Sequence, residues 1–231
     1  MNPSKSYFQF CPVARAAEVV ASRWTPILLR ELLAGNTKFN DLRVGMAKMS
    51  PSLLSKRLQE LEDAGIILKQ KAKAGKGFEY IVTDIGRELT PFVMALGVWG
   101  QKYVIKELGK HELDPGLLMW DIHRRIDVAQ FPEKGAFVAE FHLSDAPAAR
   151  RTWWVMIKDR KAELCMQPPG IDADFEVESC VRTLTDIWRG ALGIDAARKQ
   201  NQLHLKGETK YVRSFKKWFM LSPFVSAAAA Q

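Results

Sequence analysis

The sequence predicts an α+β protein with two domains, and three observations lead to this fold class. Residues 1–110 alternate short amphipathic helices with one hairpin rich in Gly and Lys. Several later segments alternate apolar and polar residues with the period of two that is typical of strands. A chain of 231 residues is also long enough to form two hydrophobic cores. We predict a first domain at residues 1–108, a second at 114–221 and a disordered tail at 222–231.

The composition is that of a globular protein with a basic first half. Residues 1–110 hold 17 Lys or Arg against 10 Asp or Glu, whereas residues 111–231 hold 17 against 16. A basic domain attracts polyanions, which indicates nucleic acid or an anionic membrane surface. No run of about 18 apolar residues and no secretory leader is visible, so we expect a cytoplasmic protein. The three cysteines form no CxxC cluster, so we expect reduced thiols and neither a disulfide framework nor a structural zinc. We also expect no metal and no cofactor.

Three helices are expected before residue 45. The first covers about residues 13–23. The second opens at Trp24-Thr25-Pro26, is heavily apolar from Ile27 to Leu33, and is expected to be largely buried. The third is short and covers residues 39–43.

The best marked helix lies between Ser50 and Gly65. Ser50 is a good N-cap, Pro51 fits the first helical position, and Gly65 supplies a left-handed residue at the end. One face carries Leu54, Leu58 and Leu61, with Leu53 beside them. The opposite face carries polar groups able to bind phosphates or base edges, and these are Ser52, Ser55, Lys56 and Gln59. Taken alone, such a face is more often only solvated.

A basic hairpin follows this helix directly. Two short β-prone runs flank a Gly-rich tip, and lysines occur along the segment at Lys69, Lys71, Lys73 and Lys76. A recognition helix followed by a basic hairpin is the plan of a winged helix-turn-helix. In that fold the helix enters the major groove of double-stranded DNA, and the wing touches the adjacent backbone.

The first domain resembles the HxlR family of winged-helix transcription regulators over residues 11–105. The resemblance is carried by Cys11-Pro12-Val13, Arg23-Trp24-Thr25, the segments 28–32 and 38–42, the helix segment 49–65, and Glu79-Tyr80-Ile81-Val82-Thr83-Asp84 with the residues up to 87. It implies a homodimer on a near-palindromic operator. The family usually has Gly-Lys-Trp where this chain has Ser22-Arg23-Trp24, so Arg23 keeps the charge and joins Ser50 and the residues above in the predicted DNA-binding set. A Pro-rich wing is replaced here by Ala74-Gly75-Lys76-Gly77-Phe78.

A long helix is predicted from the Thr83-Asp84 cap to Val104, with large apolar residues on more than one side. In the family this helix pairs with its copy across a two-fold axis. The predicted dimer interface is Leu89, Phe92, Val93, Leu96, Trp99 and Tyr103. The alternative is that this helix packs on the second domain.

Cys11 is a candidate redox sensor, because family members often carry a cysteine at this position and some of them sense oxidants. A sensor thiolate needs nearby cations, and Arg15 lies one helical turn further on. An inert thiol near the dimer interface is the alternative.

The second domain is expected to be α+β, with an antiparallel sheet covered by helices. After an amphipathic helix that starts at Asp114-Pro115-Gly116, strands are predicted at 136–143, 151–157, 162–166, 173–178 and 202–206. Helices are predicted at 180–190, 195–199 and 209–220. From about residue 130 to 220 the element order is similar to the sterol carrier protein (type two) family, whose members hold an apolar ligand between sheet and helices.

A ligand pocket of that kind would be walled by large apolar side chains. The candidates are Trp120, Trp153, Phe175, Leu184, Trp188, Phe215 and Trp218. Trp153 and Trp154 are neighbours on a strand, so they cannot both point inward. Ordinary core packing is the alternative for each of these residues.

No trusted catalytic motif occurs in the sequence, and the four histidines are scattered, so we predict that the protein is not an enzyme. We predict a homodimeric, DNA-binding transcriptional regulator whose second domain binds a lipid-like or other apolar effector. Two rivals remain. One is a carrier of apolar ligands with a basic head that docks on membranes, and the other is a regulator whose second domain is purely structural.

Overall fold

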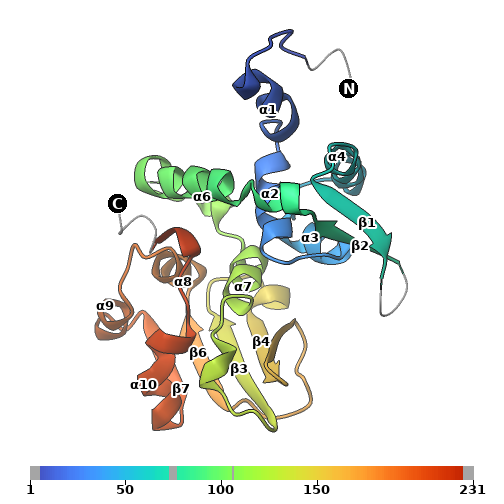
Figure 1. The fold of residues 1–231 in the computed structure, drawn as a ribbon. Coiled ribbons are helices and arrows are strands. Elements are labelled where there is room, and N and C mark those ends of the chain that lie inside the picture. Colours follow the sequence, from blue (N-terminus) through green and yellow to red (C-terminus); the bar gives the residue numbers. More distant parts are fainter. Residues whose placement is uncertain (1–5, 73–76, 106, 226–231) are drawn as a thin grey trace. The chain divides into compact units, whose positions relative to one another are not determined.

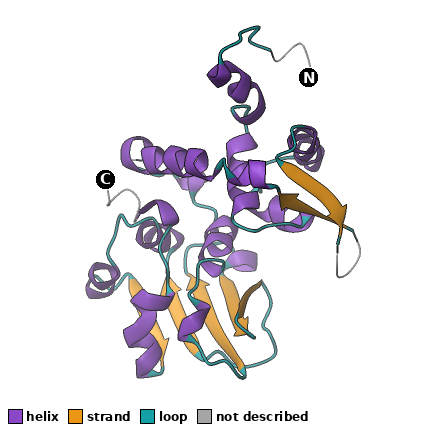
Figure 2. Cartoon of the chain, viewed as in Figure 1, coloured by secondary structure: helices purple, strands orange, loops and turns teal. Residues whose placement is uncertain are grey.

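The computed structural model describes residues 6–72, 77–105 and 107–225. The chain divides into two compact units, an N-terminal unit (Met1–Gly97) and a C-terminal unit (Val98–Gln231). Both helices and strands occur in each unit, so the α+β fold class is confirmed (Figures 1 and 2). No helix within these described ranges is long and apolar enough to cross a membrane.

The N-terminal unit contains the predicted helices and hairpin. Its elements are α1 (Pro12–Val20), α2 (Thr25–Leu33), α3 (Phe39–Gly45), α4 (Pro51–Asp63), β1 (Ile67–Lys71), β2 (Phe78–Val82), α5 (Asp84–Arg87) and most of α6 (Thr90–Trp99). The strands β1 and β2 pair antiparallel, from Ile67 opposite Val82 to Lys71 opposite Phe78. The order of helix, short helix, helix and hairpin is the winged-helix plan.

The predicted caps of α4 and α5 are confirmed. The Ser50 hydroxyl accepts the Leu53 N–H at 3.3 Å, and Pro51 occupies the first turn of α4. Gly65 lies in the left-handed region with φ +72°, which ends the helix as expected. At α5, the Thr83 hydroxyl accepts the Gly86 N–H at 3.1 Å.

The core of the N-terminal unit is built mainly from aliphatic side chains. Fully buried members include Leu28, Leu29, Leu42, Leu54, Leu58 and Leu61. Ile27 is 41% exposed, so the burial expected for the second helix holds only on the face that carries Leu28 and Leu32. The buried Glu31 carboxylate accepts hydrogen bonds from Arg30 at 2.6 Å and from Asn36 at 2.8 Å.

The helix predicted to be continuous from Asp84 is interrupted at Glu88 and Leu89. Pro91 has no N–H to donate to the carbonyl of Arg87, and the Thr90 hydroxyl donates to that carbonyl at 2.7 Å instead. A new helix, α6, therefore starts at Thr90, and a π-helical turn, η2 (Gly100–Val104), extends it.

The C-terminal unit is built on a five-stranded sheet with the order β5-β4-β3-β6-β7. Its strands are β3 (Ala136–Leu143), β4 (Thr152–Lys158), β5 (Lys161–Cys165), β6 (Phe175–Ser179) and β7 (Leu203–Gly207). The sheet is antiparallel as predicted at three of its four strand pairs, and the exception is β3 with β6, which run parallel. After the antiparallel run β3-β4-β5, the chain crosses back to the free edge of β3 and enters β6 in the same direction as β3. The alternation of apolar and polar residues along a strand is the same in parallel and antiparallel pairs, so the sequence pattern does not predict which kind of pair forms.

Helices cover one face of this sheet. They are α7 (Pro115–His123), α8 (Val181–Trp188), α9 (Ile194–Lys199) and α10 (Thr209–Trp218), with short 3₁₀ turns η3 (Lys110–Glu112), η4 (Val128–Gln130) and η5 (Ala148–Arg150). Along β6 the residues are alternately buried and exposed, so one face packs on the core. The prediction that Trp153 and Trp154 do not both point inward is confirmed, since Trp153 is buried whereas Trp154 is half-buried and donates its indole N–H to Glu140 at 2.9 Å.

The end of the described chain is more ordered than the sequence indicates. The segment 222–225 falls within the predicted tail, yet Ser222 is buried and its N–H donates to the Trp188 carbonyl at 2.8 Å. The rest of that tail, residues 226–231, lies outside the described residues.

Candidate nucleic-acid interface

The polar face of α4 is exposed along its length. Ser52, Ser55, Lys56 and Gln59 are all exposed, while Leu54, Leu58 and Leu61 on the opposite face are buried. The Ser50 and Ser52 hydroxyls lie 3.2 Å apart at the start of the helix. This face therefore presents hydroxyl, amide and ammonium groups to any ligand that lies along α4.

Two neighbours modify that face. The Gln59 amide donates to the Asp63 carboxylate at 2.9 Å, which engages one of its two N–H groups and leaves the other N–H and the carbonyl oxygen for a base. Arg57 pairs with Glu60 and turns away from the polar face, with a side chain only 13% exposed. Lys56 is exposed and no carboxylate of the described chain lies within ion-pair distance of it. Lys56 is thus the cation on this helix that is available to an anion.

The wing holds one lysine over aromatic rings. The Lys69 ammonium lies 4.7 Å from the centre of the Phe78 ring and 6.0 Å from that of Tyr80, across the hairpin. Burial raises the pKa of the Tyr80 phenol, with a smaller contribution from Glu62. The ring contacts restrict Lys69 before any ligand binds. Lys71 is exposed, whereas Lys73 and Lys76 lie outside the described residues.

The hairpin is attached to the helices by a third extended segment that the sequence does not reveal. The Tyr80 N–H donates to the Thr37 carbonyl at 2.8 Å, and Lys38 forms a β-bridge with Glu79. Two residues are too few to produce a strand pattern, so no sequence signal was available. These bonds fix the wing relative to the start of α3.

Arg23 lies exposed before α2, where its guanidinium carbon is 5.5 Å from the centre of the Trp24 ring. Trp24 has φ +79°, an uncommon conformation for a non-glycine residue. The two residues form a cation–π pair at the entrance to α2. Arg23 is therefore accessible, but it belongs to a different element from α4 and the wing.

The predicted dimer-interface residues fall into two groups. Phe92, Leu96, Trp99 and Tyr103 are 39%, 45%, 56% and 56% exposed. Val93, in contrast, is buried in the core of the N-terminal unit, and Leu89 packs against that core. Val93 points to the other side of α6 and is corrected to a core residue.

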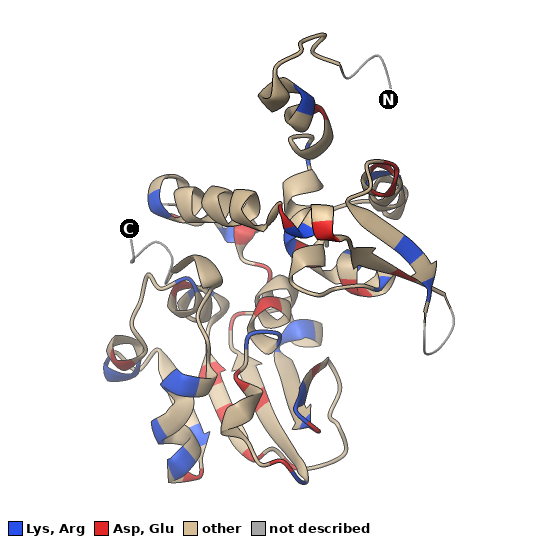
Figure 3. Ribbon diagram, viewed as in Figure 1, with Lys and Arg blue, Asp and Glu red and all other residues tan. Residues whose placement is uncertain are grey.

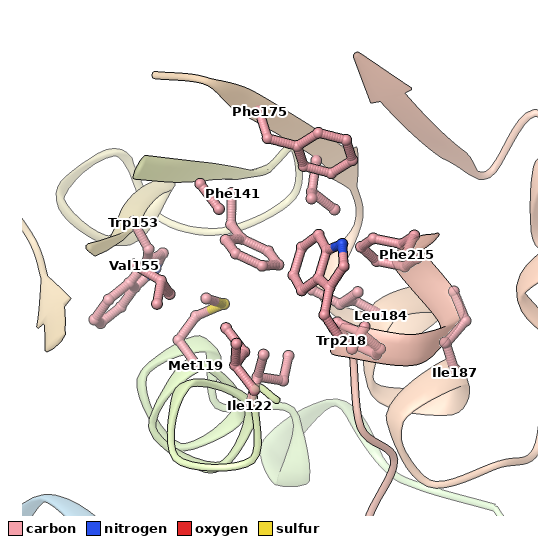
Figure 4. Packing of buried hydrophobic residues seen from close by; sticks show 14 of the residues in the cluster. Met119, Ile122, Phe141, Trp153, Val155, Phe175, Leu184, Ile187, Phe215 and Trp218 are labelled. Carbon is pink, nitrogen blue, oxygen red and sulfur yellow. The ribbon is translucent and has the colours of Figure 1, made fainter. Parts of the chain in front are cut away.

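The predicted ligand-pocket residues lie largely in the core of the C-terminal unit. Figure 4 shows the Trp218 indole among Phe141, Phe175 and Phe215. The Trp218 ring centre lies 5.4 Å from that of Phe175 and 4.8 Å from that of Phe215. These side chains, together with Leu184, fill the space between sheet and helices by contact with one another.

The other candidates for the pocket are placed differently. Trp153 is buried and donates its indole N–H to the Arg150 carbonyl at 2.8 Å. Trp120 is half-buried, with its ring centre 4.7 Å from that of His123. The buried indole nitrogen of Trp188 has no hydrogen-bond partner within the described chain.

Cys11 is half-buried and precedes α1. The cation expected to stabilise its thiolate, Arg15, has its guanidinium 2.8 Å from the Glu18 carboxylate. That ion pair reduces the positive field that Arg15 supplies to the Cys11 sulfur. Over the ranges that the structure describes, no group of three or more His, Cys, Asp or Glu side chains forms a metal cluster.

Comparisons with known proteins match both units. The family model of the HxlR-like helix-turn-helix matches residues 19–108, and that of the SCP-2 sterol transfer family matches residues 129–220. YdeP of Bacillus subtilis (strain 168), an uncharacterized HTH-type transcriptional regulator, is 34% identical over 101 residues, which are 43% of this chain and 79% of YdeP. A second regulator of the same description and organism, YybR, is 30% identical over 92 residues, which are 39% of this chain and 74% of YybR.

Solved structures similar to each part are also found. The redox regulator HypR in its reduced form is 29% identical with a TM-score of 0.38, covering 40% of this chain and 92% of HypR. Sterol Carrier Protein 2 Like 2 from Aedes aegypti is 14% identical with a TM-score of 0.32, covering 43% of this chain and 91% of that protein.

Proposed function

This chain belongs to the HxlR-like helix-turn-helix family of transcriptional regulators and carries a second domain of the SCP-2 type, and from this premise we propose how it acts on DNA. It binds a near-palindromic operator as a homodimer. The helix α4 lies in the major groove, and the wing lies on the adjacent phosphates. The observation that carries this proposal is the exposed polar face of α4, fixed by a leucine face in the core.

The proposed roles of the residues follow from their chemistry. Ser52, Ser55, Lys56 and Gln59 contact base edges or phosphates from α4, and Ser50 fixes the start of that helix. Arg23 and the wing lysines Lys69 and Lys71 contact phosphates, and we extend this role to Lys73 and Lys76 from the sequence alone.

Replacing Lys56 with alanine tests the placement of α4. The Lys56→Ala variant is expected to lose about 1–3 kcal/mol of operator binding, roughly a 5- to 150-fold rise in Kd, because it removes a contact in the groove. Fluorescence anisotropy with an operator selected from random duplexes measures this change. The matched control is Lys158→Ala, an exposed lysine on β4. Unchanged operator affinity in Lys56→Ala would show that α4 does not lie in the groove.

The homodimer is supported by the outer face of α6. Phe92, Leu96 and Trp99 follow the spacing of one helix face, and their exposed area is large for a chain on its own. Tyr103 continues that face into η2, with its ring centre 6.1 Å from that of Trp99. Pairing of this helix with its copy would bury these side chains.

An apolar effector in the C-terminal unit is the second part of the proposal. It is supported by the match to the SCP-2 sterol transfer family. Because Trp218, Phe175 and Phe215 fill the interior, an effector has to separate them on binding. Extraction of the purified protein for mass spectrometry, with a thermal-shift screen of fatty acids, sterols and aromatic compounds, tests this part. An empty protein and no shift would favour a purely structural second domain.

A further inference from the structure

Charge in the second half of the chain is strongly separated. Between Ile194 and Trp218, seven Lys or Arg occur against two Asp or Glu, whereas residues 111–193 hold ten against fourteen. The near-neutral total of residues 111–231 is therefore the sum of a cationic segment and an acidic remainder. The cationic segment covers α9, β7 and α10.

These three elements are neighbours at one edge of the sheet. Both α9 and α10 pack against β7, which is an edge strand of the sheet. The Lys216 ammonium pairs with the Asp195 carboxylate and joins α10 to α9. This hydrogen bond, with the nearby charges of Arg198 and Lys199, lowers the pKa of Asp195. Figure 3 shows blue segments gathered on α9, α10 and β7; we call this the α9–β7–α10 face.

The cations on this face are held on a rigid support. On α10, Tyr211, Phe215 and Trp218 are buried in the core, so Arg213 and Lys217 extend from the opposite side of the helix and are exposed. The aromatic anchors leave α10 little freedom to turn about its axis. The positive charges of Arg213 and Lys217 are therefore held on the solvent side of α10.

Part of this charge is neutralised within the molecule and part is not. Lys216, Lys210 and Lys206 pair with Asp195, Glu208 and Glu176. Four exposed cations have no carboxylate of the described chain within ion-pair distance, and these are Arg198, Lys199, Arg213 and Lys217. Arg198 and Lys199 also line a pocket of about 460 Å³, together with Leu203 and His204 of β7.

We propose that the α9–β7–α10 face binds the phosphate backbone of duplex DNA, in addition to the contacts of α4 and the wing. This inference rests on the proposed function, which supplies duplex DNA as the polyanion. The outward side chains of α10 are charged or polar, which suits phosphates and carries no base readout. A membrane-surface helix inserts its apolar side into lipid, but the apolar side of α10 is buried in the core. The chemistry favours DNA over an anionic membrane.

The test is the salt dependence of DNA binding by the full-length protein. A face variant, Lys199→Gln/Arg213→Gln/Lys217→Gln, removes three cations from the face. The control, Lys134→Gln/Lys158→Gln/Lys161→Gln, removes three exposed cations from another part of the C-terminal unit and has the same net charge. Each phosphate contact contributes about 0.9 to the slope of log K against log salt. In a homodimer the face variant removes three cations from each protomer, so it is expected to flatten that slope by about 4 to 5 on a long operator duplex, and the control by less than about one.

Equal slopes for the two variants, with unchanged circular dichroism and Tm, would overturn the inference. Should the wild-type protein bind no operator, the proposed function fails, and the same comparison on a random-sequence duplex decides the role of the face separately. Sedimentation with vesicles of phosphatidylserine and phosphatidylcholine completes the design. Loss of vesicle binding in the face variant with an unchanged DNA slope would assign the face to membranes and contradict our proposal.

Discussion

In the N-terminal unit the residues with the clearest functional pattern lie on the surface, whereas in the C-terminal unit they lie in the core. The polar face of α4 and the wing lysines Lys69 and Lys71 are exposed, and aliphatic side chains form the core of this unit. Three of the aromatic residues expected around a ligand, Phe175, Phe215 and Trp218, contact one another in the core. A polar helix face can thus be read from periodicity, because burial of the other face determines its direction. A cavity cannot be predicted from periodicity, because the same large apolar residues can either line a cavity or fill the space with their own side chains.

The largest expected effect tests whether Trp218 is core or pocket wall. Trp218→Ala removes a fully buried ring that contacts Phe175 and Phe215, and it should lower the free energy of unfolding by about 3–5 kcal/mol. Chemical denaturation followed by tryptophan fluorescence and circular dichroism measures the loss. Trp154→Ala, which changes a half-buried residue of strand β4, is the control and should lose less. A loss below about 1 kcal/mol in Trp218→Ala would indicate an open pocket around this ring.

A second test concerns the exposed apolar residues on the outer face of α6, which are proposed to form the homodimer interface. Phe92→Asp/Leu96→Asp introduces charge on the outer face of α6 and should weaken the homodimer by at least about 2 kcal/mol, roughly 30-fold in Kd. Sedimentation equilibrium measures the change. The matched control is Ile85→Asp, also exposed in the N-terminal unit. A dimer of unchanged affinity in the double variant would place the interface elsewhere.

The third test addresses the tight junction behind the wing. A Cβ on Gly86 would lie 2.2 Å from the Ile66 carbonyl oxygen and 2.8 Å from a Val82 methyl carbon. Gly86→Ala should therefore lower the free energy of unfolding by about 1–3 kcal/mol. Gly100→Ala is the control, because within the described chain no atom outside its own helical backbone and adjacent residues lies within 4 Å of the added Cβ. Equal thermal stability of the two variants would contradict the packing at α5.

The smallest expected effect concerns the rings beneath Lys69. Phe78→Ala removes the nearer ring and should weaken DNA binding by about 0.5–1 kcal/mol, roughly 2- to 5-fold, because the ammonium loses its restraint. The loss should be equal for operator and random duplexes, since Lys69 is proposed to touch only phosphates. Leu68→Ala, exposed on the same hairpin, serves as control. A loss confined to the operator would mean that the wing reads sequence.

Much of the fold could be predicted from the sequence because its signals are local. The caps at Ser50 and Thr83 and the turn at Gly65 depend on single residues, and each is found where expected. The break before Pro91 was missed, although the missing N–H of that proline causes it. The apolar pattern from Leu89 to Val104 favours one continuous helix, although Pro91 within it favours a break.

Features that depend on distant segments could not be predicted. The parallel pairing of β3 with β6 is decided by where the chain crosses the sheet, and alternation along either strand is the same in both directions. The sequence does not distinguish Val93 from the interface candidates, because an apolar helix residue can face either the core or a partner, and only the packing shows that Val93 faces the core. The charge separation between the segment Ile194–Trp218 and residues 111–193 is not visible in the net charge of residues 111–231, which is close to zero.

The most direct test of the central claim is the footprint of the full-length protein on operators selected from random DNA. We predict an enriched, near-palindromic motif with two protected major-groove segments on one side of the duplex, about 10 base pairs apart or a multiple of that distance. Selection without an enriched motif, or protection of a single segment, would contradict the account.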